Sequence, residues 1–349
     1  MGFGHWPLAP RSASRMARRE LGKSPFLIGR RSLAIGIGAL ASGAAWLARA
    51  APDYSDGQSV YQALAKQPAQ RLTIGGGAID VVFADGAPGL DRARVLAWVE
   101  TSARAVTTYF GRFPVVHVGL LVVADDGARV GGGTTYGFGR SATVIHVGRE
   151  ADEAAFRADW VMVHEMTHLA LPRTPRRSLW ALEGNATYVE PVARAQAGQI
   201  DPDVVWRWTL EDMVKGEPDH GDQGLDNTPT HGRVYWGGAM YYLLADIHIL
   251  QETRGRLGLQ DALRAINRQS GGNTAEWSVA ELTAVGDKAT GTRVMTTLYD
   301  QMGPAPVRVD LDGLFASLGV AERDGAIVYN DDAPLAWIRR RITQPPTSA

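Results

Sequence analysis

The segment that most constrains this chain is His164-Glu165-Met166-Thr167-His168, in which two histidines four residues apart flank a glutamate. Residues four apart on an α-helix lie about 40° apart on one face, so both imidazoles can reach one ion. Glu165 falls beside that ion, where a carboxylate can take a proton from a water whose pKa the cation lowers to about 7. The motif therefore predicts a catalytic zinc site with ligands His164 and His168 and general base Glu165.

A third ligand must come from further along the chain, because catalytic zinc usually has three protein ligands and one open position. A three-histidine site of the HExxHxxGxxH type would need a glycine at position 171 and a histidine at 174, but the chain has Leu171 and Thr174. The stretch from Pro172 to Pro175 predicts a helix break after the motif. A second helix can then return Glu183 to the metal, so Glu183 is the candidate third ligand.

The segment that contains Glu183, Trp180 to Glu190 (WALEGNATYVE), resembles the W-L-x-E-G-x-A-x-Y-x-E segment of the gluzincin clan of zinc metallopeptidases. In that clan a glutamate from a following helix completes the HExxH site, and the resemblance puts Glu183 at the ligand position. It implies an α+β fold with a thermolysin-like gluzincin core, in which a small mixed β-sheet lobe is followed by a mainly helical lobe. It also implies one Zn2+ ion and the hydrolysis of peptide or protein substrates. The resemblance covers about residues 110–320.

A second segment, Val234-Tyr235-Trp236-Gly237-Gly238-Ala239, resembles the V-Y-x-K-G-A segment of the aminopeptidase N and glycyl aminopeptidase families. The tyrosine of that segment supports the oxyanion of the tetrahedral intermediate, which implies this role for Tyr235. A phenol can donate a hydrogen bond to an oxyanion without carrying charge at neutral pH. His231 is the alternative donor, as a histidine is in other gluzincins, and His220 is a weaker one.

The Gly-rich stretch from Gly131 to Gly137 departs from the family pattern. In both families the matching strand, G-x-M-E-N or G-G-L-E-H, carries an acidic residue that helps to hold the free amino terminus of the substrate, whereas this stretch has no carboxylate. A cationic amine without a partner binds weakly, so the sequence favours an endopeptidase over an aminopeptidase. The glycines still allow a substrate backbone to pair with this edge. The residues predicted to bind substrate are Gly132, Gly133, Thr134 and Thr135.

Hydrophobic periodicity predicts the layout of the rest of the chain. Residues 51–150 are expected to form a β-rich lobe with the substrate edge strand, and residues 151–345 the zinc-site helices and a helical C-terminal lobe. Expected elements are strands within 71–83, 115–123 and 142–147, a helix at 90–109, and a zinc helix that begins near Asp152, followed by helices at 180–190, 241–252 and 258–268. His117 and His146 are expected to be structural histidines. Thr167 and Glu190 are candidate supporting residues of the metal site, although Glu190 is interpreted more readily as solvated.

The N-terminus has the pattern of an export signal at residues 1–50. Arg30-Arg31 precede an apolar run from Leu33 to Leu47 that Ala48-Arg49-Ala50 closes, which is typical of a twin-arginine leader. The run is shorter and richer in Gly and Ala than the ~20 apolar residues of a membrane span. We therefore expect a periplasmic or extracellular protein without a stable membrane span after signal removal; a retained N-terminal anchor is the alternative.

Charge and cysteine content argue against a nucleic-acid-binding protein and against a metal site with thiolate ligands. Of 36 basic and 37 acidic residues, eight and one lie in residues 1–50, so the remainder carries a net charge of −8, which argues against nucleic-acid binding. The chain has no cysteine, which excludes thiolate ligands.

The sequence leaves two rival interpretations open. One is a catalytically inactive, metal-stabilised scaffold or binding protein of the cell envelope, and the other is an enzyme that hydrolyses a non-peptide amide.

Overall fold

A five-stranded mixed sheet forms the first part of the computed structural model, which describes residues 54–345. The strand order is β1-β2-β3-β5-β4; β2, β3 and β5 run parallel, and β1 and β4 pair antiparallel with their neighbours. The elements of this part are α1 (Gly57–Lys66), β1 (Ala69–Ile74), β2 (Gly77–Phe83), α2 (Arg92–Phe110), β3 (His117–Asp125), β4 (Val130–Tyr136) and β5 (Ala142–Gly148). The predicted strands and the predicted helix at 90–109 are confirmed with shifts of a few residues.

The central strands are apolar along nearly their whole length because helices cover both faces of the sheet. On one face Val60 of α1 packs in a cluster with Leu121 and Val144. On the other face Val99 of α2 belongs to the main core, together with Leu120 and many residues of the C-terminal helices. The two histidines predicted to be structural contact carboxylates at the sheet surface, His117 with Asp80 at 2.8 Å and His146 with Asp125 at 2.9 Å.

Strand β4 lies at one edge of the sheet, with β5 as its only neighbour among the described strands. Its register with β5 shifts between Val130 and Gly133, which is the mark of a β-bulge. Bulges occur at sheet edges, where they re-aim the strand. Helix α4 packs against β4, as expected of an edge strand beside the metal helix.

The expectation that the zinc helix begins near Asp152 is wrong. Asp152 does cap a helix, α3 (Glu153–Ala158), but the chain is extended at Asp159. A separate helix, α4 (Val161–Thr167), contains His164 and ends at its C-cap, His168. The Asp159 carboxylate accepts hydrogen bonds from the backbone N–H groups of Val161 and Met162, at 3.0 and 3.1 Å. This side chain satisfies the first donors of α4 and so fixes where the metal helix starts.

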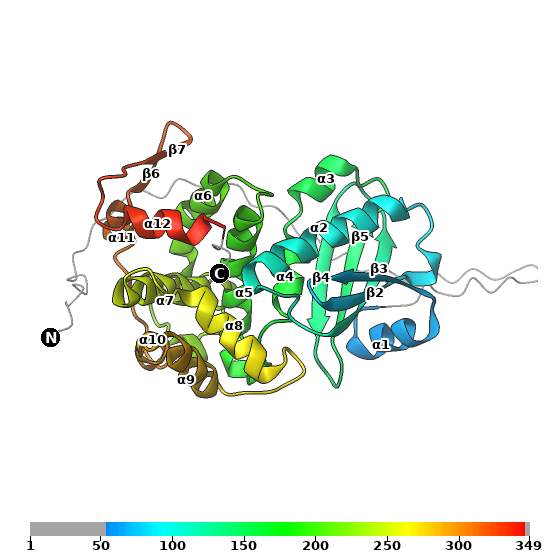
Figure 1. The fold of residues 1–349 in the computed structure, drawn as a ribbon, viewed down its shortest axis with the longest axis horizontal. Helices are drawn as coiled ribbons and strands as arrows, with labels where there is room; N and C mark the ends of the chain where they lie inside the picture. The colour runs from blue at the N-terminus through cyan, green and yellow to red at the C-terminus, as the bar shows by residue number, and fades with distance from the viewer. Residues whose placement is uncertain (1–53, 346–349) are drawn as a thin grey trace, which may run out of the picture. The chain divides into compact units, whose positions relative to one another are not determined.

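The rest of the described chain is mainly helical, with α4 and α5 between the sheet and the C-terminal helices (Figure 1). Its helices are α5 (Trp180–Gln196), α6 (Pro202–Asp212), α7 (Gly238–Thr253), α8 (Leu259–Ser270), α9 (Val279–Thr290), α10 (Val294–Met302), α11 (Leu311–Leu318) and α12 (Ala336–Thr343). A small hairpin of β6 (Val320–Arg323) and β7 (Ala326–Tyr329) precedes α12, and short turns of 3-10 helix are η1 (Ala84–Gly86), η2 (Arg176–Ser178), η3 (Met213–Gly216) and η4 (Leu225–Asn227). The expected order of a mixed sheet followed by a helical part, and with it the α+β fold class, is confirmed.

Helix α7 continues a π-helical turn, η5 (Gly232–Gly237), that the sequence did not predict. The chain between η3 and η5 is a loop that contains η4. No helix within residues 54–345 combines the length and apolar character required to cross a bilayer. The predicted export signal, residues 1–50, lies outside the described residues.

Candidate metal centre

The three predicted metal ligands lie together, although they come from two helices. Helix α4 supplies His164 and its C-cap residue, His168, and α5 supplies Glu183; one donor atom from each lies within 4.8 Å of the others. The Glu183 Oε2 atom is 3.4 Å from the Nε2 atoms of both histidines, and the two imidazole rings are nearly perpendicular at 4.9 Å between centroids. Two imidazoles and a carboxylate are the donor set of several catalytic zinc sites, so these residues fit the metal.

The electrostatics of the three groups suit a cation. Burial would raise the pKa of Glu183, but its contacts with His164 and His168 hold that pKa well below the usual range. Burial by itself would lower the pKa of His168. The carboxylates of Glu183 and Glu165 outweigh this effect, so the pKa of His168 is raised. A metal ion that binds here would compete with a proton for His168.

Helix α5 is held in place at both sides of Glu183. At its start the Trp180 indole N–H donates to Asp226 at 2.8 Å, and the hydroxyl of Tyr299 donates to the other oxygen of the same carboxylate at 2.9 Å. Immediately after Glu183, Gly184 lies against Gly238 of α7, where a Cβ atom on Gly184 would lie 2.3 Å from the Gly238 backbone. The glycines in both sequence segments thus allow α5 and α7 to meet beside the ligand.

Glu165, the predicted general base, is 6% exposed and is held by the edge strand. The Thr135 hydroxyl lies 2.9 Å from its carboxylate Oε2 atom and 2.9 Å from its backbone carbonyl oxygen, so it can donate to either. Thr143 on β5 lies 3.1 Å from the Thr135 hydroxyl and can donate to it. The side chain of Glu165 fits against the strand at Gly133, where a Cβ atom would lie 2.6 Å from Glu165 Cγ.

Tyr235, the predicted oxyanion donor, lies on the π-helical turn η5 with its ring stacked toward His164 at 6.4 Å between centroids. Burial and the carboxylate of Glu183 raise the pKa of Tyr235 to about 12. The phenol therefore keeps its proton throughout the neutral range and can donate a hydrogen bond.

His231, the alternative donor, lies behind Tyr235. Its ring stacks on the Tyr235 ring at 4.5 Å between centroids, and its side chain is exposed. Tyr235 lines the cleft together with the three candidate metal ligands, whereas His231 is absent from the cleft lining within the described part of the chain.

The cleft has a volume of about 820 Å3 and runs along the edge strand. All four residues predicted to bind substrate lie in its wall: Gly132, Gly133, Thr134 and Thr135. Among residues 54–345, Glu165 and Glu183 are the only carboxylates that line it. The absence of a substrate-binding carboxylate in the Gly-rich segment thus extends to the whole described cleft.

One known structure shares much of this arrangement of elements. An aminopeptidase N family protein from Idiomarina loihiensis superposes with a TM-score of 0.55 at 14% sequence identity, over 72% of this chain and 49% of that one. The chain has a gluzincin-like peptidase fold. A zinc metallopeptidase of the M1 family from Deinococcus radiodurans gives a TM-score of 0.42 at 15% identity, over 70% of this chain and 54% of that one. The chain spans about half the length of these structures. No protein-family model and no curated protein sequence matches it.

The gluzincin-like fold also contains a cavity that the sequence did not predict. It has a volume of about 460 Å3 and shares Trp160, His164 and Tyr235 with the cleft. Its walls come from α5, α6, η5, α7 and α12, which lie far apart in the sequence. The one sequence signal that could have indicated the cavity is the local enrichment of tryptophan at Trp206, Trp208 and Trp236.

The two predicted supporting residues have structural partners. Glu190 is buried, at 4% exposure, and its carboxylate accepts a hydrogen bond from Arg194 at 2.8 Å; the interpretation of Glu190 as a solvated residue is wrong. Arg194 is one helical turn later, and tertiary packing buries both. The Thr167 hydroxyl donates to the Val163 carbonyl of its own helix at 2.8 Å.

Proposed function

We propose that this protein is a zinc-dependent peptidase that hydrolyses internal peptide bonds of exported or envelope peptides and proteins. The observation that carries the proposal is the meeting of His164, His168 and Glu183 at one point of a cleft whose wall also holds Glu165. A structural zinc site is usually closed by four protein ligands, whereas three ligands beside a cleft leave a position open. This favours a peptidase over an inactive metal-stabilised scaffold.

His164, His168 and Glu183 would hold the zinc ion, which when bound supplies Lewis-acid activation of water and of the scissile carbonyl. Glu165 takes the proton of the attacking water and later passes it to the leaving amine. Thr135 and the glycine at position 133 keep the Glu165 carboxylate in one orientation. The Tyr235 hydroxyl donates to the oxyanion of the tetrahedral intermediate.

The edge strand favours cleavage within a chain. Strand β4 can pair with an extended substrate backbone, and its residues Gly132 and Thr134 lie in the cleft wall. An aminopeptidase would need a negative group for the substrate ammonium ion. The described cleft offers none beyond Glu165 and Glu183, which have other roles in this proposal.

Location outside the cytoplasm is part of the same proposal. It is supported by the twin-arginine pattern at Arg30-Arg31. Expression of the full chain with separate assays of the cytoplasmic and exported fractions tests it. We expect the wild type to be active in the exported fraction, with a chain shortened near residue 50. The double variant Arg30→Lys/Arg31→Lys should stay in the cytoplasm, and finding it in the same fraction as the wild type would contradict export by the twin-arginine pattern.

The test of activity compares peptides with free and N-acetylated amino termini in one mixed library, digested by the wild type and by Glu165→Gln. We expect internal cleavage of both peptide sets by the wild type, and loss of at least about 1,000-fold in the variant. Glu150→Gln, a change at an exposed glutamate outside the cleft, serves as the matched control. Removal of single residues from free amino termini alone would establish an aminopeptidase, and stoichiometric zinc without any cleavage would favour the scaffold.

A further inference from the structure

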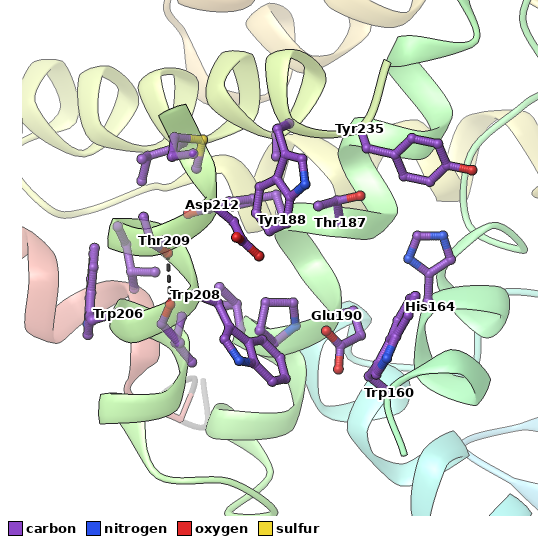
Figure 2. Close-up of a pocket in the computed structure, with 18 of the residues that line it drawn as sticks. Trp160, His164, Thr187, Tyr188, Glu190, Trp206, Trp208, Thr209, Asp212 and Tyr235 are labelled. Carbon is purple, nitrogen blue, oxygen red and sulfur yellow. Dashed lines mark hydrogen bonds between the residues drawn. The ribbon is translucent and has the colours of Figure 1, made fainter. Parts of the chain in front are cut away.

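The tryptophan-rich cavity opens directly beside the proposed catalytic residues. Figure 2 shows Tyr235, His164 and Trp160 at one end of it, and Trp206 and Thr209 at the other. His164 and Tyr235 line both the cleft and the cavity. A substrate side chain next to the scissile bond would therefore lie at the entrance of the cavity. A volume of about 460 Å3 lies in the range of roughly 300–1,000 Å3 that is usual for pockets that enclose a small ligand.

The walls of the cavity are aromatic. Helix α6 supplies Trp206 and Trp208, η5 supplies Trp236, and Trp160 stands at the mouth with 48% of its surface exposed. A large aromatic side chain exposed at the mouth of a cavity is available to contact a ligand. Aromatic walls favour aromatic guests, because paired rings attract each other beyond the burial of their apolar area.

The charged groups in the walls already have partners. Glu190 receives a hydrogen bond from Arg194 at 2.8 Å, and burial raises the pKa of Glu190 to about 7, so this pair leaves no full negative charge to attract a cation. Asp212 forms an ion pair with Lys215 at 2.5 Å. A lysine or arginine side chain that entered the cavity would lose its hydration without gaining an unpaired carboxylate.

We propose that this cavity is the specificity pocket of the enzyme and that it accepts a large apolar side chain, preferably aromatic, from a substrate residue that flanks the scissile bond. This inference rests on the proposed peptidase function and names the class of substrate. Peptides with Phe, Trp or Tyr at that position are cleaved in preference to those with Ala, by roughly 10- to 200-fold in kcat/KM, the range that hydrophobic pockets usually achieve. Peptides with Lys or Arg at that position are poor substrates.

A position-scanned library of N-acetylated peptides measures this preference. The variant Thr209→Trp adds a large side chain to the wall of the cavity, and Trp208→Ala removes one. We expect Thr209→Trp to lower the ratio of kcat/KM for aromatic over all-alanine peptides by at least about tenfold, and Trp208→Ala to lower the same ratio. Trp337→Ala on α12, which is 38% exposed and outside the cavity wall, is the matched control and keeps the wild-type preference.

A binding measurement separates failure of this inference from failure of the peptidase proposal. Tryptophan fluorescence follows the binding of N-acetyl-phenylalanine amide and N-acetyl-alanine amide to wild-type protein and to Thr209→Trp. At least about tenfold tighter binding of the phenylalanine compound, lost in Thr209→Trp, supports the pocket even when no peptide is cleaved. Cleavage without any side-chain preference, a preference for Lys or Arg, or equal binding of the two compounds would overturn the inference and leave the peptidase proposal standing.

Discussion

Gly133 of the edge strand and Glu165 of the metal helix approach each other so closely that no side chain fits between them. A Cβ atom at position 133 would lie 2.6 Å from Glu165 Cγ and 3.3 Å from its Oε1 atom. The strand that would bind substrate therefore also sets the position of the proposed base. A shift of β4 at Gly133 would therefore displace the side chain of Glu165.

Gly133→Ala should consequently reduce turnover without removing the metal. The new methyl group must displace the Glu165 carboxylate, and a misplacement of about 1 Å can cost roughly 100-fold in rate. Measurement of kcat, KM and bound zinc checks this. Gly132→Ala adds the same methyl group where it would meet nothing within 4 Å, so it should change KM more than kcat. Equal losses of kcat in the two variants would contradict the role of Gly133.

Thr135 should contribute to the rate through its hydroxyl group. Thr135→Val removes a donor 2.9 Å from the Glu165 carboxylate, and a hydrogen bond to a charged group contributes about 1.5–3 kcal/mol, or roughly 10- to 100-fold in rate. Thr135→Ser restores the hydroxyl and should recover most of kcat. Steady-state kinetics on one blocked peptide compares the three proteins, and a fully active Thr135→Val would show that Glu165 needs no such support.

The residues proposed to bind the metal, and the order of the lobes, were predictable because they depend on local spacing. Four-residue spacing puts His164 and His168 on one helical face, and the glycine after Glu183 is part of a segment that resembles those of known zinc peptidases. Alternating and continuous apolar runs predicted the strands. Each of these signals lies within a few residues of the feature it predicts.

The features that sequence did not reveal depend on contacts between distant segments. The break before α4 comes from the Asp159 side chain, which also accepts a hydrogen bond from Trp98 at 3.2 Å, a residue 61 positions away. Glu190 is a charged residue that looks solvated until packing buries it with Arg194. The cavity similarly exists only after α6 and α12 have come to lie against α5.

The close contact between Gly184 and Gly238 should make both positions intolerant of alanine. Because a Cβ atom on Gly184 would lie 2.3 Å from backbone atoms, α5 and α7 must separate, and overpacking of this kind costs about 1–3 kcal/mol. Urea unfolding of Gly184→Ala, together with its zinc affinity, measures both effects, since Glu183 is the neighbouring residue. Gly286→Ala in α9 meets chiefly the flexible Met295 side chain and should be milder. Wild-type stability and affinity in Gly184→Ala would disprove the contact.

Glu190 should make stability depend on pH. Burial raises its pKa from the ordinary 4.5 to about 7, so between these values the folded protein keeps a proton that the unfolded chain releases. Its contribution to the free energy of unfolding is thus fully present below pH 4.5 and is lost as the pH rises through about 7. Glu190→Gln cannot titrate, so the variant should gain roughly 1–3 kcal/mol relative to wild type between pH 5 and pH 8. Urea unfolding at both pH values checks this, with Glu150→Gln as control; parallel pH curves would contradict it.

Titration of metal-free protein with zinc, followed by cleavage of one N-acetylated peptide, tests the central claim most directly. We predict that wild-type activity rises to a plateau at one equivalent of zinc, that Glu165→Gln binds one equivalent without cleavage, and that Glu183→Ala needs far more zinc. Full activity of the metal-free protein, or a Glu165→Gln variant as active as wild type, would contradict the assignment of His164, His168, Glu183 and Glu165.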